Sequence, residues 1–160
     1  MIVSIIIPFF NASSTIERCI KSAISQTYKN IEIVCIDHNS EDSSVQILQK
    51  FLNSYDNISL YTELRRGANF ARNLGIKKAS GSWLNFLDAD DFISERKIEN
   101  QIRALNDTKK YHFIVSPYFH VSINGEDKKH FIKYPDTWKN LFSGNLGVTS
   151  SNLYKKKSII

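Results

Sequence analysis

Short runs of branched apolar residues alternate with amphipathic segments over the first ninety residues, and this alternation most limits how the chain can fold. The runs over 3–7 and 31–36 are apolar on both faces. Strands of that kind belong to parallel sheets that are covered by helices on both sides. Each amphipathic segment between two runs has the length of a crossover helix. The order predicts an α/β fold with a mostly parallel central sheet.

The expected boundaries follow from apolar periodicity and from the residues that interrupt it. Pro8 is expected to stop the first strand, and Ser14 with Glu17 forms a capping box for the first helix. The expected strands are 3–7, 31–36, 58–61 and one from Trp83, and the first three expected helices end near Gln26–Thr27, Tyr55 and Ala79. A fourth helix, capped by Ser94, is expected to carry Ile98, Ile102 and Leu105. Later elements are a strand over 112–116, a hairpin turn at Asn124–Gly125, a helix over 137–142 and a strand over 148–154.

Composition narrows the class of protein. The 160 residues are 42% hydrophobic, and no linker, repeat or low-complexity segment divides them, so a single domain is expected. No apolar run has the length of a membrane helix, and residues 2–10 lack a basic leader, so a cytoplasmic location is expected. Neither the two cysteines nor the four dispersed histidines have the spacing of a disulfide framework or a zinc site.

The formal net charge is +5. A basic protein suits an anionic ligand, nucleic acid or an acidic membrane surface, although a solvated lysine-rich surface gives the same charge. The basic residues are scattered and are not interleaved with aromatic ones, so no nucleic-acid partner is expected. An anionic ligand and peripheral association with a membrane stay open.

The strand from Trp83 ends in three carboxylates, Asp88, Asp90 and Asp91. In open α/β sheets the carboxyl ends of the strands are where ligands bind. Three carboxylates within four residues repel one another unless a cation lies between them. The sequence therefore predicts a divalent metal and a phosphate-bearing ligand at this edge.

Two more loops are expected at the same edge. Pro8, Phe10 and Asn11 follow the first strand, and Asp37 and His38 follow the second. A strand-end carboxylate can accept hydrogen bonds from a base or a ribose, and an aromatic ring can stack on a base. Taken singly, such an aspartate is more often a helix cap or a turn residue.

Together these segments resemble family 2 glycosyltransferases, which have the GT-A fold, a Rossmann-like three-layer sandwich. The resemblance is carried by residues 3–11, 22–28, 31–37, 67–75 and 86–91, the last of which is similar to the family's Asp-x-Asp motif. It implies inverting, metal-assisted transfer of a sugar from a nucleotide-diphosphate donor in polysaccharide or glycan synthesis. It covers residues 1–100 closely as a donor half, and 101–160 loosely as the start of an incomplete acceptor half.

The resemblance also implies roles for single residues. Pro8, Phe10, Asn11, Asp37 and His38 match the nucleotide pocket, and Asp88 matches the acidic residue near the ribose. Asp90 and Asp91, with Asp88, match the positions that hold Mg²⁺ or Mn²⁺ and the diphosphate. Arg72 matches a basic position near the donor, although a solvated helix charge is the alternative. The implied partners are a nucleotide sugar, with a UDP-sugar favoured, and a glycan or lipid-linked acceptor at the inner face of the membrane.

Two departures from the family pattern limit the interpretation. The family usually has a second acidic residue after Asp37, and this chain has His38, which can accept a hydrogen bond only when it is neutral. The family's catalytic base lies in a later acidic motif, and Asp136 stands in the wrong context, so we expect the base beyond Ile160. A nucleotide-sugar-binding module without turnover is therefore the alternative function.

Two other classes of enzyme do not fit. A Rossmann-type oxidoreductase needs a glycine fingerprint after the first strand, where this chain has no glycine. A phosphatase of the Asp-x-Asp type would carry its acidic pair at that same point. Neither pattern is found in residues 8–11.

Overall fold

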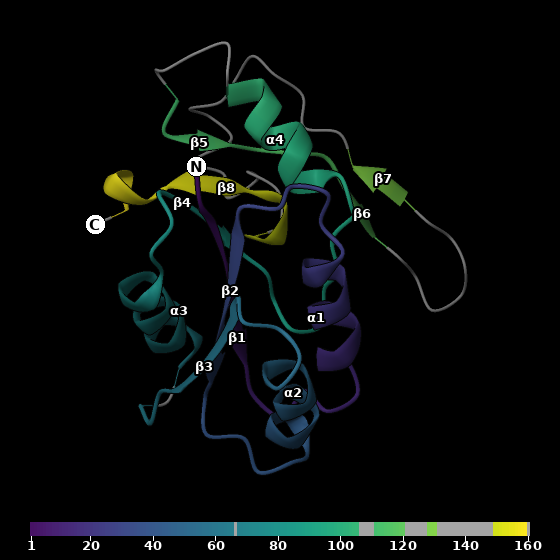
Figure 1. The fold of residues 1–160 in the computed structure, drawn as a ribbon, viewed down its shortest axis with the longest axis vertical. Coiled ribbons are helices and arrows are strands. Elements are labelled where there is room, and N and C mark those ends of the chain that lie inside the picture. Colours follow the sequence, from purple (N-terminus) through teal and green to yellow (C-terminus); the bar gives the residue numbers. More distant parts are fainter. Residues whose placement is uncertain (66, 106–110, 121–127, 131–148, 160) are drawn as a thin grey trace.

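The computed structural model describes residues 1–65, 67–105, 111–120, 128–130 and 149–159. Within them, a six-stranded sheet has the order β3-β2-β1-β4-β8-β5 (Figure 1). Its strands are β1 (Val3–Phe9), β2 (Ile31–Asp37), β3 (Ile58–Thr62), β4 (Trp83–Phe86), β5 (Phe113–Ile114) and β8 (Leu153–Lys155). The helices are α1 (Ile16–Ile24), α2 (Ser44–Leu52), α3 (Ala68–Lys78) and α4 (Lys97–Leu105).

The first four strands are parallel, and β8 runs antiparallel between β4 and β5. The predicted α/β fold with a mostly parallel sheet is therefore confirmed. A strand was predicted over 148–154, and β8 covers Leu153–Lys155. Its antiparallel direction was not predicted, because so short a run gives no sign of its direction or neighbours.

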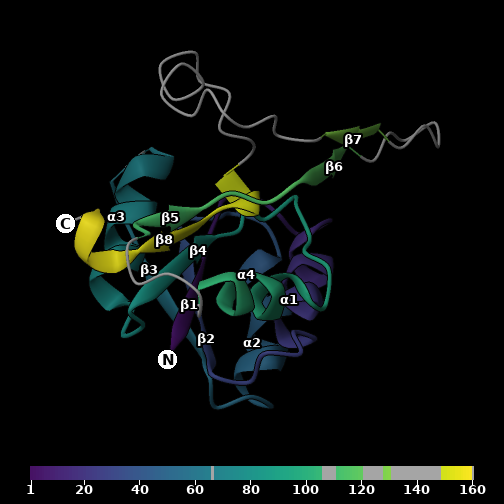
Figure 2. The same cartoon turned by 90° about the horizontal axis from the view of Figure 1, so that it is seen from above.

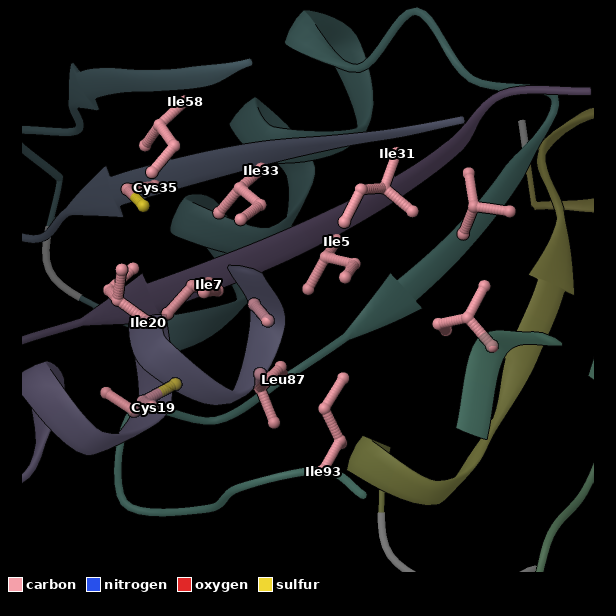
Figure 3. Close-up of a cluster of buried hydrophobic side chains, with 14 of the residues drawn as sticks. Ile5, Ile7, Cys19, Ile20, Ile31, Ile33, Cys35, Ile58, Leu87 and Ile93 are labelled. Atoms are coloured by element: carbon pink, nitrogen blue, oxygen red, sulfur yellow. The ribbon is translucent and has the colours of Figure 1, made fainter. Parts of the chain in front are cut away.

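Two apolar layers lie on opposite faces of the sheet. Ile5 and Ile7 of β1 pack with Cys19 and Ile20 of α1, in a cluster that also includes residues of α2 and α4 (Figure 3). Ile6 points to the other face, where it packs with residues of α3. Because neighbouring side chains in a strand point to opposite faces, a strand that is apolar throughout supplies both layers. Figure 2 shows α3 on one side of the sheet and α1, α2 and α4 on the other, as in the predicted three-layer sandwich.

Small residues let α3 approach the sheet closely. Ala71, Gly75 and Ala79 are buried. A Cβ at Gly75 would lie 2.3 Å from the Cγ2 atom of Ile6. The predicted small-residue face is thus confirmed at these positions, whereas Ala68 lines the cavity described below.

Pro8 does not stop the first strand, which continues to Phe9. The even-numbered residues of β1 direct their backbone groups toward β4, as the bond from the Leu87 amide to the Ile6 carbonyl shows. Since β4 ends at Phe86, opposite Ile6, the missing N–H of Pro8 removes no bond from the ladder.

The predicted cap of the first helix was wrong, and the first two helices end two or three residues earlier than expected. The capping box of Ser14 and Glu17 is not formed, because α1 begins at Ile16 after Thr15, without a side-chain cap. A turn closed by the Thr15 amide and the Ala12 carbonyl precedes it. The first two helices end at Ile24 and Leu52, before the predicted Gln26–Thr27 and Tyr55.

The later part of the chain is described only in pieces. β6 (Tyr118–His120) and β7 (Lys128–His130) are antiparallel partners on either side of the predicted hairpin. Its turn at Asn124–Gly125, the predicted helix over 137–142 and Asp136 lie outside the described residues. Short 3-10 turns, η1 (Thr149–Ser151) and η2 (Lys156–Ser158), flank β8. Among the described residues, no helix is long and apolar enough to cross a bilayer.

Candidate functional site

A cavity of about 410 Å³ opens at the carboxyl ends of β1, β2 and β4. Its wall comes from three loops and from the start of α3, which are far apart in sequence. It is lined by Pro8, Phe9, Phe10, Asn11, Ala12, Ser14, Thr15, His38, Ala68, Ala71, Arg72, Asp88, Ala89 and Asp90. This is the edge at which parallel α/β sheets bind ligands.

The loops after β1 and β2 are bonded to each other. The Asn11 amide donates to the Ser40 hydroxyl at 3.0 Å, and the Asn11 side-chain oxygen accepts from the Glu41 amide at 2.9 Å. Asn11 has a φ of 47°, a left-handed conformation that asparagine tolerates better than most residues. These bonds use the backbone amide and the side-chain oxygen of Asn11, and they fix the two loops to each other at the cavity wall.

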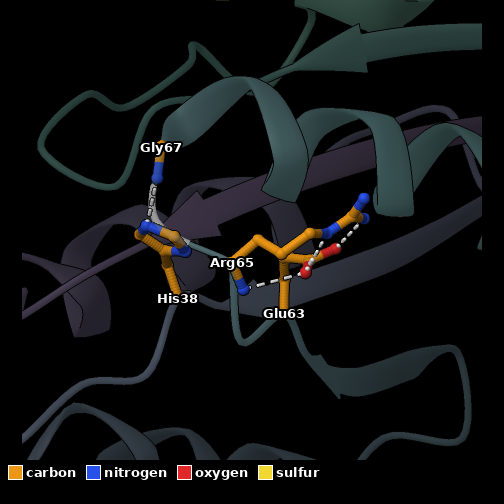
Figure 4. Close-up of polar contacts among 4 residues, drawn as sticks. All are labelled: His38, Glu63, Arg65 and Gly67. Atoms are coloured by element: carbon orange, nitrogen blue, oxygen red, sulfur yellow. Dashed lines mark hydrogen bonds and ion pairs between the residues drawn. The ribbon is translucent and has the colours of Figure 1, made fainter.

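His38 is held by the first residue before α3. Its Nε2 atom accepts a hydrogen bond from the Gly67 amide at 2.6 Å (Figure 4). A backbone amide can only donate, so Nε2 is the nitrogen of the ring that accepts in this arrangement. Nδ1 is buried and has no hydrogen-bond partner among the described residues, and the ring meets the Phe10 ring edge-on with centroids 6.0 Å apart. The accepting nitrogen of His38 is therefore already used, which argues against the idea that it replaces an acidic acceptor for a base.

An ion pair supports the turn that leads to Gly67. Arg65 donates to the buried Glu63 carboxylate through Nε at 2.8 Å and through a terminal nitrogen at 2.7 Å (Figure 4). These bonds lower the pKa of Glu63 to about 2. The Arg65 guanidinium also lies over the Phe70 ring, 4.6 Å from its centroid. This contact joins the end of β3 to the first turn of α3.

Arg72 and Asp88 form an ion pair in the cavity wall, with 2.7 Å between a guanidinium nitrogen and Oδ1. Their side chains are 28% and 33% exposed, so both reach the cavity while they contact each other. Arg72 Nε is buried and has no hydrogen-bond partner in the part of the chain that the structure describes. The alternative of a solvated helix charge is not what the structure shows.

The other two carboxylates differ from each other. Asp91 accepts a hydrogen bond from the Ser150 hydroxyl and does not line the cavity. Asp90 lines the cavity, is exposed, and makes no side-chain hydrogen bond or ion pair with the described residues. The predicted repulsion is thus relieved at Asp88 and Asp91 by groups of the protein, and Asp90 alone of the three has no side-chain partner among the described residues.

Side chains of α1 contact the main chain of the irregular segment over 88–96, which lies between β4 and α4. The Cys19 thiol lies 3.6 Å from the Asp88 carbonyl, and Arg18 donates to the Asp90 carbonyl at 2.7 Å. Further along, the Ser22 hydroxyl accepts from the Ile93 amide at 3.2 Å. Burial raises the pKa of the Cys19 thiol, which keeps it neutral. The carboxylate loop is therefore fixed through its main chain, although it has no regular secondary structure.

The cavity can hold a divalent cation only with help from a ligand. Among the described residues, no three histidine, cysteine or acidic side chains converge on one point. Asp88 and Asp90 would supply two oxygen ligands, and hard cations such as Mg²⁺ and Mn²⁺ take about six. The residues present fit a cation whose other ligands are water and the oxygens of a bound diphosphate.

Seven of the predicted site residues line the cavity: Pro8, Phe10, Asn11, His38, Arg72, Asp88 and Asp90. Asp37 does not. It is buried at the end of β2, where it accepts from the Ser40 amide at 3.0 Å, so it supports the loop. Their roles toward a ligand stay predictions. Arg18 and Ser150 were missed: an exposed arginine on α1 and a serine 59 residues after Asp91 show no local pattern.

Comparison with known sequences decides the family. A sequence model described as Glycosyl transferase family 2 matches residues 4–159 of this chain. The chain belongs to glycosyl transferase family 2. The resemblance found in the motifs is therefore confirmed over nearly the whole length.

Two curated relatives illustrate the breadth of the family. A UDP-Glc:alpha-D-GlcNAc-diphosphoundecaprenol beta-1,3-glucosyltransferase, WfaP, of Escherichia coli is 42% identical over 118 residues, which are 74% of this family 2 chain and 46% of the relative. A cholesterol galactosyltransferase of Borreliella burgdorferi is 31% identical over 166 residues, 99% of this chain and 45% of the relative. The chain thus spans less than half the length of these relatives.

Solved structures share the fold. A Pyrobaculum calidifontis mannosyltransferase, PcManGT, in complex with GDP-Man and Mn²⁺ superposes with a TM-score of 0.71 at 20% identity, over 97% of this chain and 44% of the other. S. aureus TarS with UDP-GlcNAc gives a TM-score of 0.67 at 18% identity, over 98% and 46%. The GT-A fold of this family 2 chain is therefore confirmed.

Proposed function

We propose that this chain is the donor-binding part of a glycosyltransferase that takes a sugar from a nucleotide diphosphate with inversion at the anomeric carbon. One observation carries the proposal. The cavity at the carboxyl edge joins an Arg72–Asp88 ion pair and the free Asp90 carboxylate to the aromatic ring of Phe10. A nucleotide sugar has a flat base, ribose hydroxyls and a doubly charged diphosphate. Phe10 suits the base, Asp88 suits the ribose, and Arg72 and Asp90 suit the diphosphate with its cation.

In this proposal each residue contacts a different part of the donor. Phe10 is 55% exposed at the rim, where its ring can stack on a base. Asp88 can accept from a ribose hydroxyl with the oxygen that Arg72 leaves free. Arg72 adds positive charge beside the diphosphate, and Asp90 faces it as the ligand of a divalent cation. A bound Mg²⁺ or Mn²⁺ would stabilise the negative charge that develops on the departing diphosphate.

Inversion follows from a single displacement. The acceptor hydroxyl forms its bond to the anomeric carbon on the face opposite the diphosphate, while the bond to the diphosphate oxygen breaks. The hydroxyl proton must pass to a general base. Among the described residues, the carboxylates that line the cavity are Asp88 and Asp90, and the donor uses both.

No carboxylate of the described cavity wall is then left to act as the general base, and this favours the second candidate, a donor-binding module without turnover. We still expect a general base outside the described residues. The relatives' names mention lipid-linked and sterol acceptors. For this chain we propose a glycan or lipid-linked acceptor, polysaccharide or glycan synthesis, and a place at the inner face of the membrane.

Thermal unfolding with UDP, GDP and the matching nucleotide sugars, with Mn²⁺ or with EDTA, tests donor binding. A ligand at 100 times its Kd adds about 2.7 kcal/mol to the free energy of unfolding. We expect a UDP compound to raise the Tm most, and more with Mn²⁺ than with EDTA, and Asp90→Ala to abolish the additional rise that Mn²⁺ gives. Asp56→Ala removes an exposed carboxylate outside the cavity and is the matched control. An additional rise with Mn²⁺ that persists in Asp90→Ala would overturn the assignment.

A further inference from the structure

Arg18 joins α1 to the carboxylate loop by two different contacts. A terminal guanidinium nitrogen donates to the Asp90 carbonyl oxygen at 2.7 Å. The guanidinium carbon also lies 4.9 Å from the centroid of the Phe92 ring. Asp90 and Phe92 lie on either side of Asp91, so the Arg18 side chain contacts the loop at two points. Neither Arg18 nor Phe92 lines the cavity.

The carboxylate of Asp90 depends on its main chain for its direction. Asp88 is oriented by Arg72 and Asp91 by the Ser150 hydroxyl, whereas the Asp90 side chain has no such partner among the described residues. The Asp90 side chain is short, so the position of its Cα atom limits the region that the carboxylate can reach. A bond that restrains the main chain at Asp90 therefore limits where the carboxylate lies before a ligand arrives.

We propose that Arg18 is a positioning residue for Asp90. It fixes the main chain from behind, so that the free carboxylate already faces the place of the cation and the diphosphate. This proposal rests on the proposed function. Arginine suits the task because its planar group can donate in its plane and stack on a ring at the same time, which a lysine ammonium cannot do.

The alternative is that Arg18 only strengthens the fold. Its side chain is exposed, and its contacts join surface groups, so a purely structural role would appear as a lower Tm without ligand. A positioning role would appear in ligand affinity, and there only when the cation is present. The two roles are thus separated by comparing affinity with Mn²⁺ and with EDTA.

Calorimetric titration of Arg18→Met with UDP and with GDP provides the test. Methionine keeps much of the apolar stem and loses both guanidinium contacts. Groups that orient a metal ligand typically change affinity by 10-fold or more when they are removed, so we expect about tenfold weaker nucleotide binding with Mn²⁺. With EDTA we expect no change in Kd, and the Tm without ligand should stay within about 2 °C.

Two further variants sharpen the result. Lys21→Met removes another exposed cation of α1, which pairs with Glu17 and does not reach the loop, so its Kd should equal that of the unchanged chain. Arg18→Lys keeps the charge and should recover only part of the lost affinity.

Three results would overturn the proposal. The first is an unchanged Kd in Arg18→Met with Mn²⁺. The second is an equal loss of affinity with Mn²⁺ and with EDTA, and the third is an equal loss in Lys21→Met. If the unchanged chain binds neither nucleotide under any condition, the proposed function fails as well, and that outcome is distinct from the others.

Discussion

Acidic side chains stand at both edges of the sheet, but their surroundings are opposite. At the amino edge, the Glu32 carboxylate accepts from the Ser4 hydroxyl at 2.5 Å, from the Ser80 amide and hydroxyl at 2.6 and 2.8 Å, and from the Gly81 amide at 3.1 Å. At the carboxyl edge, the Asp90 carboxylate has no partner among the described residues. The same chemical group is saturated at one edge and left free at the other.

The difference separates stability from binding. A carboxylate that is surrounded by donors ties β1, β2 and the turn before β4 together, and it has little capacity left for a ligand. A carboxylate without partners adds little to folding but keeps its full capacity for a cation. Substitutions at the amino edge should therefore change the free energy of unfolding, and those at the carboxyl edge should change affinity.

Among the substitutions at the amino edge of the sheet, Gly81→Ala is expected to lower the free energy of unfolding most. A Cβ there would lie 2.4 Å from the Ser4 hydroxyl oxygen and 2.8 Å from the Ile2 carbonyl and the Ser4 amide nitrogen. Backbone atoms cannot move aside cheaply, so we expect a loss of about 3 kcal/mol in the free energy of unfolding, measured in urea. Ser82→Ala, at an exposed neighbouring position, is the control and should be near neutral. A loss below about 0.5 kcal/mol in Gly81→Ala would show that the turn is not tightly packed.

Glu32→Gln tests the charge of the same network. The hydroxyl bonds from Ser4 and Ser80 hold the pKa of Glu32 below its ordinary value, against the effect of partial burial. We expect a loss of about 2 kcal/mol at pH 7, since hydrogen bonds to a charged group are replaced by bonds to a neutral one.

The sign of the pH dependence follows from the lowered pKa. The contribution of Glu32 is fully present above its unfolded pKa of about 4.3, and it is lost as the pH falls through the folded pKa. The difference between Glu32→Gln and the unchanged chain should therefore shrink below about pH 4. Urea unfolding across that range measures it, with Glu95→Gln as an exposed control. A difference that is independent of pH would contradict the assigned role of the charge.

The parallel part of the sheet was predictable because each of its strands is a local run of apolar residues. The apolar runs over 3–7 and 31–36 determined the parallel core, and the strand-end rule placed Asp88 and Asp90 beside the loops after β1 and β2. Pro8 misled the prediction of a boundary because its effect depends on where β4 ends, which is not a local property.

The partners of the carboxylates were less predictable. Repulsion among three aspartates correctly indicated that something must lie between them, but the sequence suggested a cation alone. In the structure Arg72 from α3 and Ser150 from η1 satisfy two of the three. Arg72 was noticed only through the family resemblance, and Ser150 comes from a segment whose position depends on the antiparallel β8.

The smallest effect on stability is expected from a pair of variants in the cavity, Asp88→Asn and Asp90→Asn. Asp88→Asn removes a partly exposed ion pair with Arg72 and should lower the free energy of unfolding by about 1 kcal/mol or less. Asp90→Asn removes no contact with a described residue and should stay within about 0.5 kcal/mol. Urea unfolding without nucleotide measures both, with Asp56→Asn as the exposed control. If Asp90→Asn were the more destabilising of the two, its carboxylate would have a structural partner, and the contrast between the two edges of the sheet would be lost.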